Sequence, residues 1–211
     1  MSAGWTTLEL DIVDALTRRV RLLSEQQGRA LWSRSVESNE ALGLVIERLC
    51  RGGLLRRTIV NAHPGLSVEA PLVTWAPGTA RPNFVEVVSR IRKRWNQAAT
   101  PTRIYSASPQ AANLFGASAL TSSPFMRRDH DLLLGEVFVF YHTHYPDRAK
   151  RWLGEAAVAK AGCGTKNQDA LLLATDGRPL CAIESAGNAR RKHIERFHQH
   201  CAANHLPYEL W

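Results

Sequence analysis

The sequence predicts a mixed α/β protein, with α+β character, built from two domains. Its first third has the apolar spacing of amphipathic helices and is followed by runs with the two-residue period of strands. Its last half predicts the order helix, strand, strand, strand, helix, strand. With 211 residues, of which 45% are hydrophobic and 22% charged, the chain is long enough to bury such cores.

The N-terminal third predicts three helices. Ser24 can cap the second helix, "SEQQGRALW", and Ser38 or Asn39 can cap the third, which Gly52-Gly53 ends. Apolar residues at helical spacing mark the first and third helices: Leu8, Ile12, Val13 and Leu16, then Leu42, Val45, Ile46 and Leu49.

The runs "LLRRTIVNAH" and "APLVTWAP" read as strands, separated by the turn-rich "HPGLSVE". We expect them to pair as a hairpin. Three helices followed by a two-stranded hairpin is the winged helix-turn-helix arrangement, and we assign it to residues 5–80. A helical scaffold or a protein-binding winged helix is the alternative, because Glu37, Glu40 and Glu47 lie in or beside the third helix.

The net charge of +8 favours a polyanionic partner, of which nucleic acid is the commonest. A basic solvated surface is the plainer explanation. If the domain binds DNA, the start of the third helix can enter the major groove, where Asn39 suits an adenine edge. The expected base-side contacts are Ser35, Ser38, Asn39 and Gly43, and the expected phosphate contacts are Arg34, Arg48, Arg51, Arg56 and Arg57.

The segment "RPNFVEVVSRIRKRWNQ" predicts a basic helix that links the two domains over residues 81–100. Its polar side carries Arg90, Arg92, Lys93 and Arg94, which could follow a phosphate backbone or simply form a solvated face. The pattern breaks near residues 96–102, so we place the second domain at 101–211.

In the second domain, "DHDLLLGEVFVFYHTHY" is long enough for a helix, although its β-branched and aromatic residues also allow a strand. The run "RWLGEAAVA" reads as a strand, and "DALLLAT" and "PLCAIES", joined by "DGR", read as a hairpin of buried strands. A helix, "ARRKHIERFHQHCAANH", and a strand, "LPYELW", follow. This order is that of a restriction-endonuclease-like core.

On the segments "DHDLLLGEVFVFY", "WLGE", "QDALLLATDG" and "AIESAG", the second domain resembles the PD-(D/E)XK nuclease superfamily. The whole chain is similar to replication-relaxation-type proteins of plasmids and mobile elements, which also join a winged helix to such a core. The resemblance implies that Asp169 and Glu184 are the metal-binding acids and that Glu136 is the helical acid that completes the site.

Two or three carboxylates of this kind would hold Mg²⁺. The chain departs from the family pattern at Gln168, where the family has Pro, and at Ala186, where it has the Lys that orients the nucleophile or shields the phosphate. Four other residues could supply that positive charge: Lys166, Arg190, Arg191 and Lys192.

Two further groups are interpreted as structural. Asp129-His130-Asp131 could suggest acid–base chemistry but fits the cap of a helix. The C-terminal group of His193, His198, His200, Cys201 and His205 is interpreted as core and surface residues, because a zinc site needs ligands that converge.

We therefore expect a protein that binds double-stranded DNA, as a transcription regulator or a replication factor of a mobile element, with a degenerate nuclease-like domain for binding or for homodimer formation. It requires no cofactor. The competing expectation is an Mg²⁺-dependent endonuclease directed by the winged helix, and a third is a protein-interaction adaptor. The N-terminus "MSAGWTTLELD" lacks a signal core, which predicts a cytoplasmic protein without membrane contact.

Overall fold

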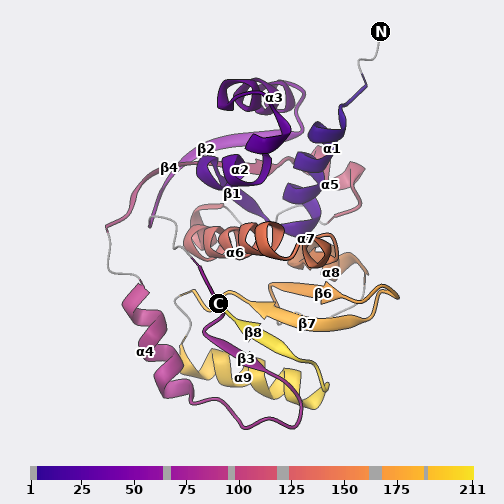
Figure 1. Cartoon of the computed structure of the whole chain (residues 1–211). Helices are drawn as coiled ribbons and strands as arrows, with labels where there is room; N and C mark the ends of the chain where they lie inside the picture. The colour runs from indigo at the N-terminus through magenta and orange to yellow at the C-terminus, as the bar shows by residue number, and fades with distance from the viewer. Residues whose placement is uncertain (1–3, 64–67, 95–97, 118–123, 162–167, 188–189) are drawn as a thin grey trace.

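A long helix, α6 (Pro124–His144), lies between two β-sheets (Figure 1). The structure is a computed structural model that describes residues 4–63, 68–94, 98–117, 124–161, 168–187 and 190–211. The smaller sheet has the strand order β1-β4-β2 and the larger sheet the order β3-β8-β7-β6-β5. Neighbouring strands are antiparallel except β7 and β8, which are parallel. The described chain is thus a mixed α/β structure, as the sequence predicts.

The N-terminal unit, which we define as α1 to β2 with β4 and α5, lies above α6 in Figure 1. Side-chain caps fix where its helices begin, because they satisfy backbone N–H groups that the helix leaves unpaired. Ser24 and Ser38 cap α2 and α3 as predicted. The elements are α1 (Thr7–Asp14), a π-helical turn η1 (Ala15–Arg19), β1 (Leu22–Ser24), α2 (Glu25–Trp32), a 3-10 turn η2 (Ser33–Ser35), α3 (Asn39–Arg51), β2 (Leu55–Ala62), β4 (Thr100–Ala107) and α5 (Pro109–Leu114).

The C-terminal unit, which we define as β3, α4 and α6 to β8, lies below and around α6. In chain order from α6 it gives helix, strand, strand, strand, helix, strand, with two extra helices, α7 and α8. The predicted strand "RWLGEAAVA" is a strand only at its start and then becomes α8. The elements are β3 (Val73–Trp75), α4 (Phe84–Arg94), α7 (Pro146–Ala149), β5 (Trp152–Gly154), α8 (Glu155–Ala161), β6 (Ala170–Leu173), β7 (Pro179–Glu184), α9 (Arg191–Ala203) and β8 (Tyr208–Leu210).

The predicted hairpin between the strands around residues 54–63 and 70–77 does not form. β2 instead pairs with β4 along its whole length, from Leu55 opposite Ala107 to Ala62 opposite Thr100. β3 joins the larger sheet, where Val73 lies opposite Leu210 and the Trp75 ring stacks on Tyr208 at 5.4 Å. The period of a strand predicts which face is buried but does not identify its partner. Here each strand finds its partner far away in the sequence, across the predicted boundaries at residues 80 and 100.

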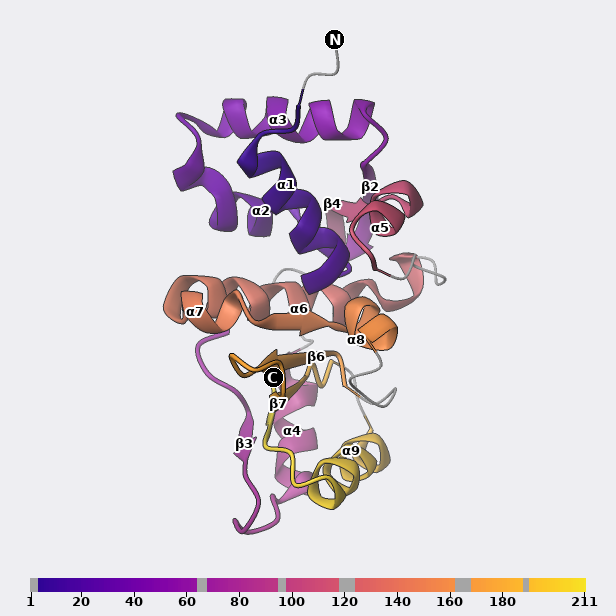
Figure 2. The ribbon, with the colours of Figure 1, turned by 90° about the vertical axis from the view of Figure 1, so that its right-hand side faces the viewer.

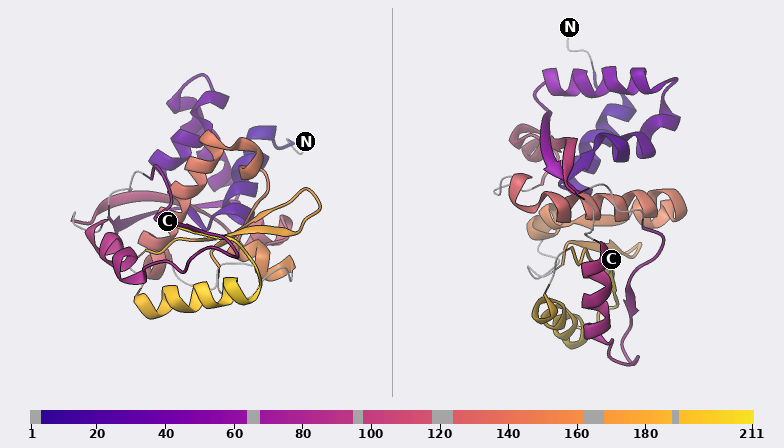
Figure 3. Two further views of the ribbon diagram at one scale, coloured as in Figure 1. Left: turned by 60° about the horizontal axis from the view of Figure 1, so that its bottom comes forward. Right: turned by 90° about the vertical axis from the view of Figure 1, so that its left-hand side faces the viewer.

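The two sheets pack on opposite sides of α6 (Figure 2). Leu132 of α6 belongs to a buried cluster with β1, β2 and β4 residues, whereas Val137 and Tyr141 pack in the cluster that contains Ala170 and Ile183 of the larger sheet. Helices α4 and α9 cover the other face of the larger sheet (Figure 3). Because α6 is buried from both sides, three consecutive leucines, 132–134, are all at most 5% exposed.

A joint between η1 and β5 holds the two units together. The Arg19 guanidinium donates to the carbonyls of Ala149, Lys150 and Trp152 at 3.2, 2.6 and 2.7 Å. The Trp152 indole N–H in turn donates to the Arg19 carbonyl at 2.9 Å. A Cβ atom on Gly154 would lie 2.2 Å from that same carbonyl oxygen, so the close approach requires glycine.

None of the helices that the structure describes is both long enough and apolar enough to span a bilayer.

Replacing Gly154 with Ala should lower the free energy of unfolding by about 3 kcal/mol, because the added methyl group collides with the backbone and not with a flexible side chain. Urea unfolding followed by circular dichroism measures this. Gly43→Ala is the matched control, since a Cβ there meets nothing within 4 Å. In the exposed interior of α3 it should raise stability by about 0.5–1 kcal/mol. Equal effects of the two substitutions on stability would contradict the claim that the close approach of η1 and β5 requires glycine at position 154.

Candidate metal centre and nucleic-acid interface

Two carboxylates lie together where adjacent strands of the larger sheet end. Asp169 immediately precedes β6, and its backbone N–H donates to the carbonyl of Ile183 at 3.1 Å. Glu184 is the last residue of β7. The two residues are only 5% and 4% exposed. The β6–β7 hairpin therefore presents both acids to the same buried position.

A histidine from α6 completes this group. Potential ligand atoms of His130, Asp169 and Glu184 all lie within 4.8 Å of one another, and we call these residues the acid–histidine cluster. Glu136, the helical acid expected here, lies outside it, where its Oε2 accepts a hydrogen bond from Gln27 Nε2 at 2.9 Å. An α-helix turns by about 100° per residue, so six residues place the directions of His130 and Glu136 about 120° apart around the helix. The two side chains consequently leave α6 on different sides.

The neighbouring Asp131 orients the His130 imidazole. His130 Nδ1 lies 3.2 Å from Asp131 Oδ1, and Nε2 lies 3.0 Å from Asp169 Oδ2. Burial lowers the pKa of His130, but the charge of Asp169 and the hydrogen bonds with Asp131 and Asp169 outweigh this effect and raise the pKa to about 10. At neutral pH, His130 in this arrangement is therefore a cation between two acids.

Arg127 brings a second positive charge to Asp169. Its Nη2 atom lies 3.3 Å from Asp169 Oδ1, and its Nη1 atom lies 3.2 Å from Glu155 Oε2. Burial lowers the pKa of Arg127, but the charges of Glu155, Asp131 and Asp169 together raise it. The Ser185 backbone N–H donates to Asp169 Oδ2 at 2.8 Å. Both oxygens of Asp169 thus have partners.

Glu184 has its own histidine partner at the start of α9. His193 Nε2 lies 2.7 Å from Glu184 Oε1. Burial and the charge of Asp169 raise the pKa of Glu184 to about 7, against the opposite effect of His193 and His130. The hydrogen bond with Glu184 in turn raises the pKa of His193. The Glu184 carboxyl can therefore gain or lose a proton near neutral pH.

Position 186 offers no positive charge to the cluster. Ala186 is 2% exposed and packs with Ile194 and Leu210 in the core beneath α9. Arg127 contacts Asp169 from α6 instead. Of the other candidates, Lys166 lies outside the described residues, and the three at the start of α9 are exposed: Arg190, Arg191 and Lys192.

The donor set of the cluster fits a divalent metal ion. Such ions take nitrogen and oxygen ligands at about 2.0–2.2 Å, so small movements would bring all three side chains to bonding distance. A metal-binding histidine usually donates its other N–H to a carboxylate, and Asp131 is placed to accept it. An imidazole beside two carboxylates suits Mn²⁺ better than Mg²⁺, which prefers oxygen ligands alone. The positive charges of His130 and Arg127 would compete with the ion for Asp169.

The sequence did not identify His130, Asp131, Arg127, Glu155 or His193 as parts of a site. Residues 129–131 lie within α6, which begins at Pro124, so the interpretation of this triplet as a helix cap is wrong. Arg127, His130 and Asp131 are spaced i, i+3 and i+4, which places them on one face of the helix. That spacing was the available signal, and it required knowing where the helix begins.

The predicted DNA contacts, which lie on α3 and on the segments before and after it, are exposed. Ser38 uses its hydroxyl to cap the helix, accepting the Ala41 N–H at 3.2 Å. Leu44 on the same helix is 66% exposed, and Glu40 and Glu47 are exposed beside it. The surface therefore mixes basic, acidic and apolar groups. Its predicted contacts are exposed: Arg34, Ser35, Ser38, Asn39, Gly43, Arg48, Arg51, Arg56 and Arg57.

Among the predicted phosphate contacts, Arg48 already forms an ion pair with an acid. Its guanidinium pairs with Glu9, which is 1% exposed, and lies over the Trp5 ring at 5.8 Å. Glu9 also accepts hydrogen bonds from the backbone and hydroxyl of Thr6, both at 2.8 Å. Arg48 therefore joins α3 to α1, and a phosphate contact would have to share or replace this ion pair.

Helix α4 belongs to the C-terminal unit, where its apolar side packs against α9 and the larger sheet. The guanidinium of Arg90 donates to the Leu72 carbonyl at 3.0 Å. Arg94 is partly buried, and burial together with the charge of Arg90 lowers its pKa. Arg92 and Lys93 are exposed. Arg90 is exposed as well, so three of the four basic residues expected to follow a phosphate backbone face solvent.

Glu9→Gln should lower the free energy of unfolding at pH 7 by about 1–2 kcal/mol, because the charged hydrogen bonds to Thr6 and Arg48 weaken. Burial raises the pKa of Glu9, but the hydrogen bonds of Thr6 and Arg48 bring it below the ordinary 4.5. A lowered pKa stabilises the fold above pH 4.5, and this contribution is lost as the pH falls through the folded-state pKa. Urea unfolding between pH 3 and 7 should show the two proteins converge at low pH.

The exposed Glu37 provides the control for this series, since Glu37→Gln should stay within about 0.5 kcal/mol of the parent protein. A difference between Glu9→Gln and the parent that stays constant down to pH 3 would contradict the role of the Glu9 charge.

Comparisons with protein-family models, with curated proteins and with solved structures find no match to this chain.

Proposed function

We propose that this protein binds double-stranded DNA through its N-terminal unit, which has a winged helix arrangement. The order α1, β1, α2, α3, β2, β4, with β4 between β1 and β2, supports this arrangement. In it, β2 and β4 take the place of the hairpin, and the chain makes β3 and α4 between them. The observation that carries the proposal is that one side of α3 is exposed along the helix and that β2, the next element, carries exposed arginines.

On this surface, Asn39 in the first turn of α3 is the residue suited to reading a base edge, because an amide can pair with adenine at two atoms. Arg51, Arg56 and Arg57 are suited to phosphates, which fix orientation without reading sequence. The net charge of +8 supports the same partner. Roles in transcription regulation or in replication of a mobile element stay predictions, as do the homodimer and the cytoplasmic location, because they rest on sequence motifs alone.

For the C-terminal unit we propose a restriction-endonuclease-like core. The order α6, β5, β6, β7, α9, β8 and the parallel pairing of β7 with β8 support it. The buried Ala186 favours a core that binds DNA or a second subunit without cutting, since the usual lysine has no replacement at that position. The proposal keeps the degenerate nuclease-like domain that the sequence predicts.

A second candidate function, a metal-dependent DNA endonuclease, is favoured by the acid–histidine cluster. His130, Asp169 and Glu184 would hold the ion, with Mn²⁺ preferred to Mg²⁺. A bound ion would lower the pKa of a water molecule and stabilise charge on a phosphate. Arg127, which has 35% of its side chain exposed, could turn from Asp169 toward a phosphate oxygen. His193, half-exposed beside Glu184, could accept or release a proton.

Single substitutions Arg51→Ala, Arg56→Ala and Arg57→Ala should each weaken binding to any duplex and lower the slope of log K against log salt by about one. Asn39→Ala should instead cost about 1–3 kcal/mol on the preferred sequence and relax its selectivity. Fluorescence anisotropy at several salt concentrations measures both. Arg178→Ala is the control, because Arg178 lies at the turn between β6 and β7 and pairs with Asp176. Equal losses at Arg178 and Arg56 would rule out a specific α3–β2 surface.

If the second candidate function holds, the protein should nick supercoiled plasmid with Mn²⁺, and more slowly with Mg²⁺. Asp169→Asn, Glu184→Gln and added EDTA should each abolish nicking, because each removes a ligand or the ion. Gel electrophoresis of the plasmid measures this, with Asp176→Asn at the exposed turn as the control. Duplex binding without nicking in either metal would leave DNA binding as the function and remove the endonuclease.

A further inference from the structure

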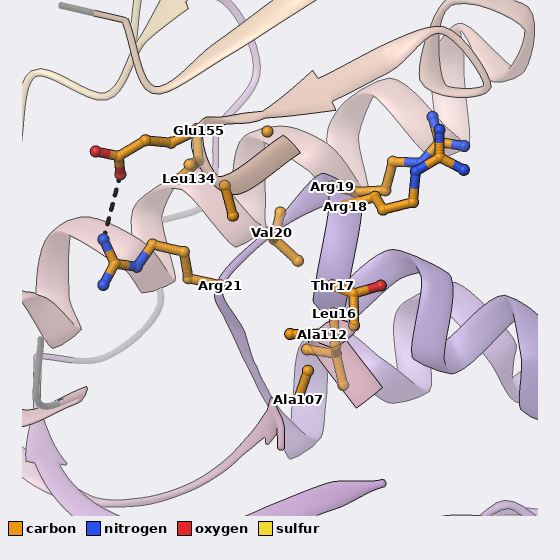
Figure 4. A pocket seen from close by; sticks show the side chains of 12 residues that line it. Leu16, Thr17, Arg18, Arg19, Val20, Arg21, Ala107, Ala112, Leu134 and Glu155 are labelled. Atoms are coloured by element: carbon orange, nitrogen blue, oxygen red, sulfur yellow. Dashed lines mark hydrogen bonds and ion pairs between the residues drawn. The ribbon is translucent and has the colours of Figure 1, made fainter. Parts of the chain in front are cut away.

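One residue of the N-terminal unit reaches the groups that surround the acid–histidine cluster. Arg21 lies between η1 and β1, and its side chain is 12% exposed. Its Nε atom lies 3.5 Å from Asp131 Oδ2, and its Nη1 atom lies 3.2 Å from Glu155 Oε2. Figure 4 shows the second contact, and both of its residues line a small pocket between η1, α6 and α8. One guanidinium thus contacts two acids of the C-terminal unit.

Each of those two acids contacts one of the two cationic side chains, His130 and Arg127, that contact Asp169. Asp131 accepts from His130 Nδ1, whose other nitrogen contacts Asp169 Oδ2. Glu155 pairs with Arg127, whose guanidinium also contacts Asp169 Oδ1. Two chains of contacts therefore begin at Arg21 and end on the two oxygens of one carboxylate.

The burial of Asp131 makes its partners costly to remove. Its side chain is 3% exposed and lies between Arg21, His130 and, at 3.9 Å, Arg127. A buried carboxylate that loses one cation is left with an uncompensated charge and must draw closer to its remaining partners. Such a movement changes the hydrogen bond that sets the orientation of His130.

The backbone that carries Arg21 is held rigidly against the C-terminal unit. Arg19, two residues earlier, donates to three carbonyls around α7 and β5, and Gly154 lies against its carbonyl oxygen. On its other side, Arg21 leads into β1, which pairs with β4. β4 pairs in turn with β2, the strand that carries Arg56 and Arg57. Arg21 is therefore placed between the proposed DNA surface and the cluster.

We infer that Arg21 is a positioning residue through which the N-terminal unit sets the geometry of His130 and Asp169. The consequence for metal affinity rests on the second candidate function, but the consequence for His130 does not. Outer partners of metal-binding histidines typically change metal affinity by about 10–100-fold when they are removed. A shift of the smaller sheet caused by DNA would reach the cluster along the same contacts.

The first measurement uses the metal-free full-length protein with ¹³C-labelled histidine. The chain has eight histidines, and the imidazole signal that disappears in His130→Gln is that of His130. Arg21→Ala should move the His130 signal and leave those of exposed histidines, such as His205, in place. Arg21→Lys should move the His130 signal less than Arg21→Ala does, because one ammonium group can reach one of the two acids. Arg18→Ala is the matched control, since Arg18 is 45% exposed and pairs with Asp14 of its own helical segment.

The second measurement titrates Mn²⁺ by electron paramagnetic resonance, where Arg21→Ala should raise the dissociation constant about tenfold or more relative to Arg18→Ala. Glu155→Gln removes the charge of the second acid that Arg21 contacts and should also move the His130 signal. This variant tests the same contacts if Arg21→Ala does not fold. A folded Arg21→Ala protein with an unchanged His130 signal would overturn the inference. Absence of Mn²⁺ binding in the parent protein would remove the second candidate function alone, and the His130 signal would still test Arg21.

Discussion

Two carboxylates buried next to each other require positive charge at close range, and the arrangement of the C-terminal unit follows from this requirement. Asp169 is neutralised by His130 and Arg127, and Glu184 by His193. His130 and Arg127 come from one face of α6 because they are three residues apart. Their own charges are balanced by Asp131 and Glu155, and those acids by Arg21. The result is a network of alternating charges that extends from the ends of β6 and β7 to the N-terminal unit.

Helix α6 can carry this network only because it is enclosed on both sides. Arg127, His130 and Asp131 in its first half lie at the ends of β6 and β7, while Leu132 packs in the cluster of the smaller sheet. Gly135 permits the approach on that side, since a Cβ there would lie 2.9 Å from Gln27 Oε1. A metal ion at the cluster and DNA at α3 would therefore lie on opposite sides of α6. This gives the two proposed activities a physical connection.

The features that local sequence determines were predicted well. Ser24 and Ser38 begin their helices because a hydroxyl can accept a backbone N–H within three residues. The β6–β7 hairpin formed around Asp176-Gly177, where glycine has the positive φ of the turn. The features that depend on distant partners were not predicted, such as the pairing of β3 with β8. The site shows the same division: the hairpin brought Asp169 and Glu184 together, but the choice of His130 over Glu136 depended on how α6 is rotated against the sheet.

The chain leaves the smaller sheet after β2, builds β3 and α4 against the larger sheet, and returns to the smaller sheet as β4. During synthesis on the ribosome this order delays folding. β3 and the apolar side of α4 are synthesised long before α9 and β8, which cover them. β8 is needed to join β3 to the sheet, because it lies between β3 and β7. The larger sheet can close only when residues 208–210 have been made. Until then the nascent protein exposes a strand edge and an apolar helix face, which are surfaces that chaperones recognise.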